Sequence, residues 1–240
     1  MSLIFPKWMN HLPTLLAVVG GGGATTAIAG FWYYATPKFY EAGYMPTQPG
    51  GGFSHQIHAG KLGMDCRYCH TKIETSAEAN IPNVATCAGC HTDGKLTKLA
   101  ESDTHKKRTE FIREAYAKDA SVEWRRVHKV PDYVRNFPHQ IHLNRGISCY
   151  SCHGRIDTMP VVFQKEPLSM SWCLDCHRNP EPHILADADR WKFTDLQWVE
   201  GELKKRTESG EAGAASLKSA QDTIKLRHIQ APENCGACHY

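Results

Sequence analysis

The sequence has little net charge and few long apolar runs. Its formal net charge is only +3 over 240 residues, and basic residues alternate with acidic ones, so nothing supports a surface for nucleic acid. Apolar residues make up 41% of the chain, and part of this share lies in one N-terminal segment. The length predicts one or two domains, and the composition predicts that side chains alone do not supply the apolar core.

The chain also lacks any cysteine outside one repeated pattern. All 10 cysteines lie in five Cys-x-x-Cys-His motifs, which contain Cys66, Cys69 and His70; Cys87, Cys90 and His91; Cys149, Cys152 and His153; Cys173, Cys176 and His177; and Cys235, Cys238 and His239. No cysteine remains for a separate disulfide. The motifs therefore account for all of the thiol chemistry of the chain.

The histidine in each motif separates two interpretations of the cysteine pairs. Four-cysteine zinc ribbons also use two Cys-x-x-Cys pairs at such a spacing, but a fifth pair would have no partner here. His follows all five pairs although the chain has only 14 histidines. Cys-x-x-Cys-His is the attachment pattern of c-type haem, in which two thiols bind one porphyrin and the histidine coordinates its iron. The sequence therefore predicts five covalently bound haem c groups.

Two of the motifs belong to a duplicated segment. Residues 53–70 read FSHQIHAGKLGMDCRYCH and residues 137–153 read FPHQIHLNRGISCYSCH. Each has an aromatic residue, two histidines three positions apart, and then a haem motif. Such a repeat presents two ligands one helical turn apart, which can serve two neighbouring haems. The candidate second axial ligands are therefore His55, His58, His139 and His142.

One further axial ligand is needed if every iron has two protein ligands. His128 precedes the second duplicated segment and is the first choice among the remaining histidines. Met159 and Met170 precede the fourth motif and are the alternatives, although a single methionine usually fills space in a core. A methionine ligand would raise the potential of its haem.

The N-terminal segment predicts a membrane anchor. Residues 12–35 carry no charge and would form a helix about 36 Å long, enough to cross a hydrocarbon core of about 30 Å. A cleaved signal peptide is the alternative, with a cleavage-like sequence at Ala27–Ala29, but the aromatic belt at Phe31–Tyr34 favours a retained anchor. The glycine run at Gly20–Gly23 predicts close packing against another membrane protein.

These features give a domain plan. Residues 1–11 are cytoplasmic, 12–35 span the inner membrane and 36–52 are a linker. Residues 53–136 form a first two-haem module with a helical insert over 99–126, 137–185 a second such module, and 186–240 a C-terminal segment with the fifth haem. We expect α-helices and irregular loops around the haems, and a periplasmic haem domain because c-type haems are attached outside the cytoplasm.

The segments FSHQIHAGKLGMDCRYCH, VHKVPDYVRNFPHQIH and SWCLDCHRNPEPH carry a family resemblance. The first resembles class III multihaem cytochromes c, and the chain as a whole is similar to the pentahaem subunit of bacterial alternative complex III, a quinol-oxidising complex. The resemblance implies a class III-like fold and electron transfer from quinol oxidation. It implies iron–sulfur and integral-membrane partner subunits, with a downstream cytochrome c or terminal oxidase as acceptor. It also implies that His55 serves the haem on Cys66 and Cys69, that His139 serves the haem on Cys149 and Cys152, and that His58 and His142 reach other haems.

Two other functions use the same motifs. A multihaem reductase of nitrite or a similar oxyanion needs one five-coordinate haem, and the chain has no Cys-x-x-Cys-Lys variant and has spare histidines. A stand-alone quinol dehydrogenase would place its first haem soon after the anchor, whereas a long stretch separates Ala35 from Cys66. We therefore expect a non-catalytic electron-transfer subunit.

Overall fold

The domain is built from short helices and long irregular connections. The computed structural model describes residues 6–35, 42–50, 52–92, 94–96, 102–130, 134, 137–208 and 210–239. In these ranges no strand is present, and the only β-type pairing is an isolated antiparallel bridge between Ile147 and Ile184. The mostly helical class predicted from the sequence is confirmed.

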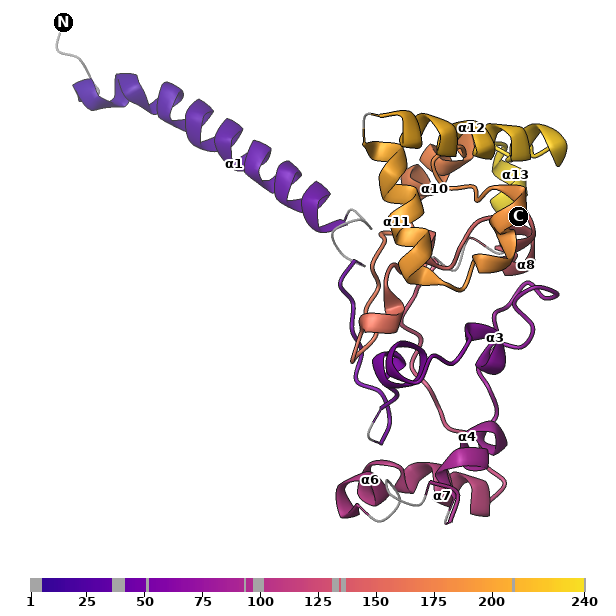
Figure 1. The fold of residues 1–240 in the computed structure, drawn as a ribbon. Coiled ribbons are helices and arrows are strands. Elements are labelled where there is room, and N and C mark those ends of the chain that lie inside the picture. The colour runs from indigo at the N-terminus through magenta and orange to yellow at the C-terminus, as the bar shows by residue number, and fades with distance from the viewer. Residues whose placement is uncertain are drawn as a thin grey trace, which may run out of the picture.

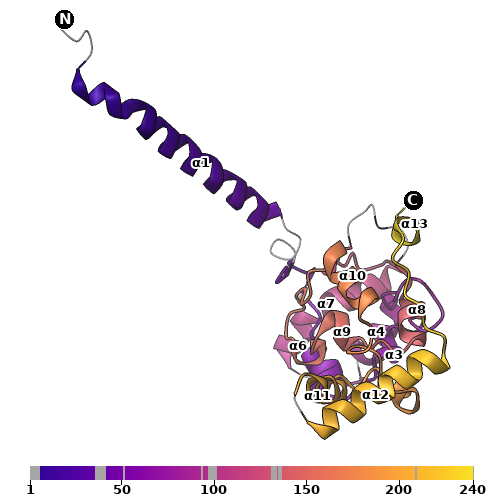
Figure 2. The ribbon, with the colours of Figure 1, turned by 90° about the horizontal axis from the view of Figure 1, so that it is seen from above.

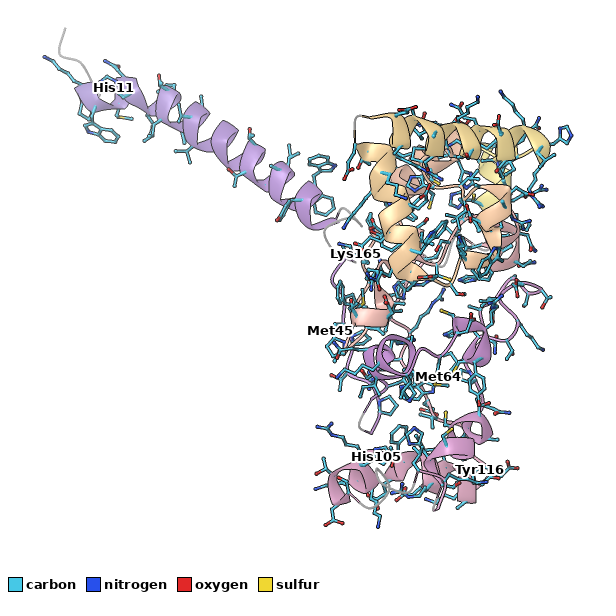
Figure 3. The ribbon with its side chains drawn as sticks, in the orientation of Figure 1. His11, Met45, Met64, His105, Tyr116 and Lys165 are labelled. Carbon is cyan, nitrogen blue, oxygen red and sulfur yellow. The ribbon has the colours of Figure 1, made fainter. Side chains whose placement is uncertain are left out.

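The first long helix stands apart from the rest of the chain. Helix α1 (Leu12–Ala35) follows the short 3-10 turn η1 (Lys7–His11) and has the bounds that the uncharged run predicts. It projects away from the other helices (Figure 1), and none of its most apolar stretch is buried against the rest of the chain. It is long and apolar enough to cross a membrane. His11 lies at its far end (Figure 3), remote from every cysteine motif.

The remaining elements form one stacked body, which Figure 2 shows from above. In Figure 1, α4, α6 and α7 lie at one end of this body and α12 and α13 lie towards the other. The elements are η2 (Gln56–Lys61), α3 (Cys66–Cys69), α4 (Val84–His91), α6 (Asp103–Arg108), α7 (Glu110–Ala117), α8 (His139–Asn144), α9 (Tyr150–His153), η3 (Ile156–Thr158), α10 (Met170–Arg178), η4 (Asp187–Lys192), α11 (Leu196–Thr207), α12 (Glu211–Leu226) and α13 (Cys235–Cys238).

Capping side chains start three of the helices that carry cysteine motifs. Asp65 accepts a hydrogen bond from the backbone N–H of Arg67 at the start of α3, and Asn83 accepts one from Thr86 at the start of α4. Ser169 does the same at the start of α10. These caps satisfy N–H groups that a helix leaves unpaired, so very short helices can begin directly before the cysteines.

The side-chain core is small, and one motif cysteine, Cys149, packs against it. Its centre is a cluster of Ile73, Leu185, Phe193 and Val199. Only ten hydrophobic side chains of the described residues are buried, which is few for a chain of this length. The composition predicted this shortage of apolar core.

The predicted linker at 36–52 is tied to the domain in the part that the structure describes. The backbone of Gly43 and Tyr44 pairs with the backbone of Gln164 at 2.6 and 3.0 Å. The Gln164 side chain is fully buried and accepts a hydrogen bond from the N–H of Lys129 at 3.0 Å. The chain after α1 is therefore fixed beside the segment that follows η3.

The helical insert predicted for 99–126 is shorter than expected, which corrects that boundary. Its described part contains α6 and α7 only, and α7 ends at Ala117, just before Asp119 adopts a left-handed backbone with φ of 49°. The chain then runs without helix, and Gln48 pairs with the backbone N–H and carbonyl of Arg125 at 2.9 and 2.8 Å. These non-local hydrogen bonds replace the helical ones. Residues 97–101 lie outside the described ranges.

A buried arginine joins the C-terminal helices to the loop after α10. Arg206, on α11, donates from one guanidinium nitrogen to the carbonyls of Glu181, Pro182 and Ile184 at 2.9, 3.1 and 2.8 Å. It also donates to the Ser216 hydroxyl on α12 at 2.8 Å. Because these carbonyls come from one turn of loop, a single side chain supplies donors that the loop itself lacks.

Replacing this arginine is expected to destabilise the domain. Arg206→Met leaves several buried carbonyls without a donor, and we expect the free energy of unfolding to fall by about 3 kcal/mol. Denaturant unfolding followed by circular dichroism measures the change. Lys218→Met on the exposed face of α12 is the matched control and should change stability by less than about 0.5 kcal/mol. Equal stability of the two variants would contradict the role given to Arg206.

Candidate haem sites

Each of the five cysteine motifs forms a single helical turn or ends a short helix. We number them sites 1 to 5 in chain order. In sites 1, 3 and 5 the backbone N–H of the histidine donates a hydrogen bond to the backbone carbonyl of the first cysteine. The distances are 2.8, 2.9 and 2.9 Å for His70, His153 and His239. This turn brings both thiols and the imidazole of a motif close together, as attachment to one porphyrin requires.

The motifs line one continuous cavity of about 2760 Å³. All ten cysteines and twelve of the fourteen histidines line it; the exceptions are His11 and His228. Divided among five groups, the cavity offers about 550 Å³ each, within the range of about 300–1,000 Å³ usual for a cofactor-sized site. The space therefore suits five large planar groups better than five single ions.

Two pairs of histidines face each other across this cavity. The ring centroids of His58 and His91 are 6.0 Å apart, and those of His142 and His177 are 6.3 Å apart. A histidine nitrogen binds a metal ion at about 2 Å, so two imidazoles on opposite sides of one iron have centroids about 6 Å apart. The two pairs thus have the separation of an axial ligand pair, at sites 2 and 4.

The outer nitrogens of the His58 and His142 rings are held by backbone carbonyls. The Nδ1 atoms of His58 and His142 lie 2.9 and 3.0 Å from the carbonyls of Ser54 and Pro138, and Phe53 and Phe137 stack on the two rings at 4.3 and 4.8 Å. A hydrogen bond at Nδ1 fixes the ring and leaves Nε2 for the metal. The two halves of the duplication therefore share one ligand geometry.

A cluster of histidines occupies the centre of the body, between sites 1 and 3. His139 is held through Nδ1 by the carbonyl of Ala77 at 2.8 Å, and His128 contacts His153 with ring centroids 4.1 Å apart. Among the described residues, three buried imidazole nitrogens have no hydrogen-bond partner: Nδ1 of His55, Nε2 of His128 and Nδ1 of His153. Nitrogens without a partner in a buried cavity fit a site that receives a polar or metal-containing group.

Burial keeps His55, His128 and His153 of this cluster neutral. Burial, with a smaller contribution from neighbouring imidazoles, lowers the pKa of His55 and of His128 to about 4. The pKa of His153 falls well below its ordinary value for the same reasons. Neutral imidazole is the form that binds a metal, so these side chains are ready ligands at neutral pH.

Contacts between sites give their order in space. His58 joins site 1 to site 2, and His142 joins site 3 to site 4. The thiols of Cys66 and Cys149 interact with each other, which lowers the pKa of Cys66 and raises that of Cys149, so sites 1 and 3 are neighbours. The Nδ1 atom of His177 lies 2.6 Å from the carbonyl oxygen of Pro232, to which it can donate a hydrogen bond, and Pro232 lies beside site 5. The order is therefore 2, 1, 3, 4, 5.

The two candidate methionines and the other histidines that line the cavity lie in different surroundings. Met170 lines the cavity but is 61% exposed, whereas Met159 is buried and does not line it. His183 lines the cavity in the loop that Arg206 holds. His105 contacts His91, a neighbour that the sequence pattern did not indicate. Among the described residues, no group of three or more His, Cys, Asp or Glu side chains is placed to hold a bare metal ion.

The comparison with known proteins supports a multihaem cytochrome c. No protein-family profile matches the chain. The multihaem cytochrome c subunit of menaquinone reductase from Nitratidesulfovibrio vulgaris is 28% identical over 182 residues, which cover 68% of this chain and 80% of the relative. A match of this extent, with the cysteine motifs around one cavity, supports the prediction of a multihaem cytochrome c.

Removing one facing histidine is expected to open one iron. In His58→Phe we expect one haem to change from low spin to high spin, because His91 would remain as its only protein ligand. Electron paramagnetic resonance of the oxidised protein measures the change. His228→Asn, at an exposed histidine outside the cavity, should leave all signals unchanged. A low-spin spectrum for His58→Phe would contradict the pairing of His58 with His91.

The close contact between Gly60 of η2 and the backbone of η3 provides a second test of how the candidate ligands are held. A Cβ at Gly60, in η2, would overlap the carbonyl oxygen of Asp157 in η3. Gly60→Ala is therefore expected to push η2 aside, lower stability by about 1–3 kcal/mol and loosen His55 and His58. Optical spectra should show a larger high-spin fraction. Gly89→Ala, where a Cβ meets nothing within 4 Å, is the control and should match the unchanged protein.

Proposed function

We propose that this protein is a membrane-anchored pentahaem cytochrome c that transfers electrons inside a quinone-linked respiratory complex. The observation that carries the proposal is the single cavity in which all five motifs follow one another in the order 2, 1, 3, 4, 5. Sites in contact with their neighbours suit a relay. Haem c, when bound, supplies one-electron oxidation and reduction.

The residues of the chain divide this task between attachment and ligation. The ten cysteines would hold the porphyrins covalently, and the motif histidines would bind the irons on one side. His58 and His142 would complete sites 2 and 4, and His55, His128 and His139 are three candidates for the second ligands of the two central sites, 1 and 3. Met170 stays an alternative ligand near the fourth motif, and Met159 a weaker one because it does not line the cavity. With two protein ligands on each iron of sites 1 to 4, no coordination position is left there for a substrate, which favours electron transfer over bond-making catalysis.

The surrounding complex is proposed to resemble alternative complex III. Electrons from quinol oxidation would arrive through an iron–sulfur subunit and leave to a cytochrome c or a terminal oxidase. Helix α1 would anchor the chain in the inner membrane with the haem domain in the periplasm. Gly20–Gly23 on α1 have nothing within 4 Å of an added Cβ, and small residues of this kind allow a second membrane helix to approach closely.

The opposite direction of electron flow is a second candidate. The similar chain from Nitratidesulfovibrio vulgaris is named as a subunit of a menaquinone reductase, so this chain could deliver electrons to the quinone side. Both directions use the same sites and the same anchor. They differ in which end of the relay is reduced first.

Reduction of the intact complex tests the function and its direction. We expect a menaquinol analogue to reduce the haems of the detergent-solubilised complex within one turnover. The same analogue should leave the isolated chain oxidised, because quinol chemistry belongs to partner subunits. Reduction of a menaquinone analogue by the pre-reduced complex, without the forward reaction, would favour the second candidate. Quinol oxidation by the isolated chain, or nitrite consumption by its reduced form, would contradict the proposal.

The haem count is tested by removing the last site. We expect five haems per chain by the pyridine haemochrome method, and four in the double variant Cys235→Ala and Cys238→Ala, because no other thiols can attach that porphyrin. Intact-mass measurement provides the independent count. Ala237→Ser, between the same cysteines, is the control and should keep five. Fewer than five haems in the unchanged chain would contradict the proposed relay.

A further inference from the structure

The motif histidine of site 2, His91, has a side chain as the partner of its outer nitrogen, Nδ1. His105, on α6, places its Nε2 atom 3.3 Å from the Nδ1 atom of His91. The two rings are nearly parallel, with an interplanar angle of 25° and centroids 5.2 Å apart. His105 is labelled in Figure 3, at the end of the body that contains α4 and α7. The contact brings a residue outside the cysteine motifs to site 2.

This arrangement differs from that of the other hydrogen-bonded candidate ligands. Five of them use a backbone carbonyl as the partner of Nδ1, namely His58, His70, His139, His142 and His177. At His91 the partner is a side chain. A side-chain partner can change in chemistry with a single substitution, whereas a peptide carbonyl cannot.

The geometry excludes His105 as the axial partner of His91. His58 faces His91 at the separation of a ligand pair, and His105 meets the Nδ1 side of the same ring. With Nδ1 engaged by His105, Nε2 is the nitrogen left for iron. His105 is therefore placed to accept the Nδ1 proton of His91.

We propose that His105 is a positioning residue that orients His91 and lowers the redox potential of the haem at site 2. The inference rests on the proposed function, since it requires haem at Cys87 and Cys90. An acceptor at the outer nitrogen of a ligating histidine makes that ligand more basic. A more basic axial ligand stabilises the oxidised iron, so the potential falls.

The backbone around His105 is fixed in a way that suits this role. Thr109 donates its hydroxyl to the carbonyl of His105 at 2.8 Å and is itself buried. Arg113, on α7, donates to the Thr109 hydroxyl at 2.8 Å. The imidazole of His105 is thus carried by a helix turn that α7 holds in place. Site 2 stands at one end of the order 2, 1, 3, 4, 5, where a potential set apart from the others affects electron exchange with a partner.

Three substitutions at one position test the proposal. His105→Phe removes the acceptor, His105→Gln keeps a neutral acceptor, and His105→Glu supplies an anionic one. In a redox titration of the intact detergent-solubilised complex, followed by optical and paramagnetic resonance spectra, we expect one of the five haems to shift. Its potential should rise in His105→Phe, stay near the original in His105→Gln and fall in His105→Glu. The spin state of all five haems should stay unchanged.

A control variant and three contrary results complete the test of His105. His228→Asn should leave every potential unchanged. No shift in His105→Phe and His105→Glu, shifts in the same direction in both, or a new high-spin haem in His105→Phe would each overturn the inference. Peptide mass analysis of the unchanged complex separates the two levels: absence of haem on Cys87 and Cys90 would overturn the proposed function at this site, whereas haem present without a shift would overturn the role of His105 alone.

Discussion

The pairing of histidines from separate segments is the constraint on which the domain depends. His58 faces His91 and His142 faces His177, so each duplicated segment reaches past its own motif to the next one along the chain. Such pairs replace the apolar layers that usually join helices, because the buried hydrophobic side chains are few and only four of the ten form the cluster around Leu185 and Val199. We therefore expect folding of this domain to be coupled to acquisition of its metal-containing groups, as it is in other small metal-dependent domains.

Much of the site could be predicted from the sequence because its chemistry is written in local spacing. Two thiols and a histidine must be neighbours in the chain to hold one porphyrin, so each motif is complete without knowledge of the fold. The extent of α1 was equally local, since an uncharged run ends where a charged or helix-breaking residue appears. The repeat at His139 and His142 also marked the candidate ligands, because a duplicated sequence tends to reproduce a duplicated geometry.

The rest depends on contacts between distant residues, which carry no local signal. Nothing near His105 in the sequence indicates that its ring meets His91, and the order of the sites follows from contacts such as that of Cys66 with Cys149. The end of the insert at Ala117 was also missed, because Arg125 exchanges helical hydrogen bonds for a non-local pair with Gln48. Buried Gln164 joined the expected linker to the domain in the same way.

The symmetry of the relay bears on the choice between quinol oxidation and quinone reduction. A row of sites in contact conducts equally well in both directions, so the order 2, 1, 3, 4, 5 by itself favours neither. Direction must come from differences in potential between the two ends and from the partners bound there. The ends do differ: site 2 has a side-chain acceptor at its motif histidine, whereas the His177 ring at site 4 meets a backbone carbonyl next to site 5. Under the role proposed for His105, the acceptor at His91 sets the potential of site 2, so this end of the order can be tuned separately from the other sites. Chemistry one hydrogen bond away from the iron can thus give direction to an otherwise symmetrical path.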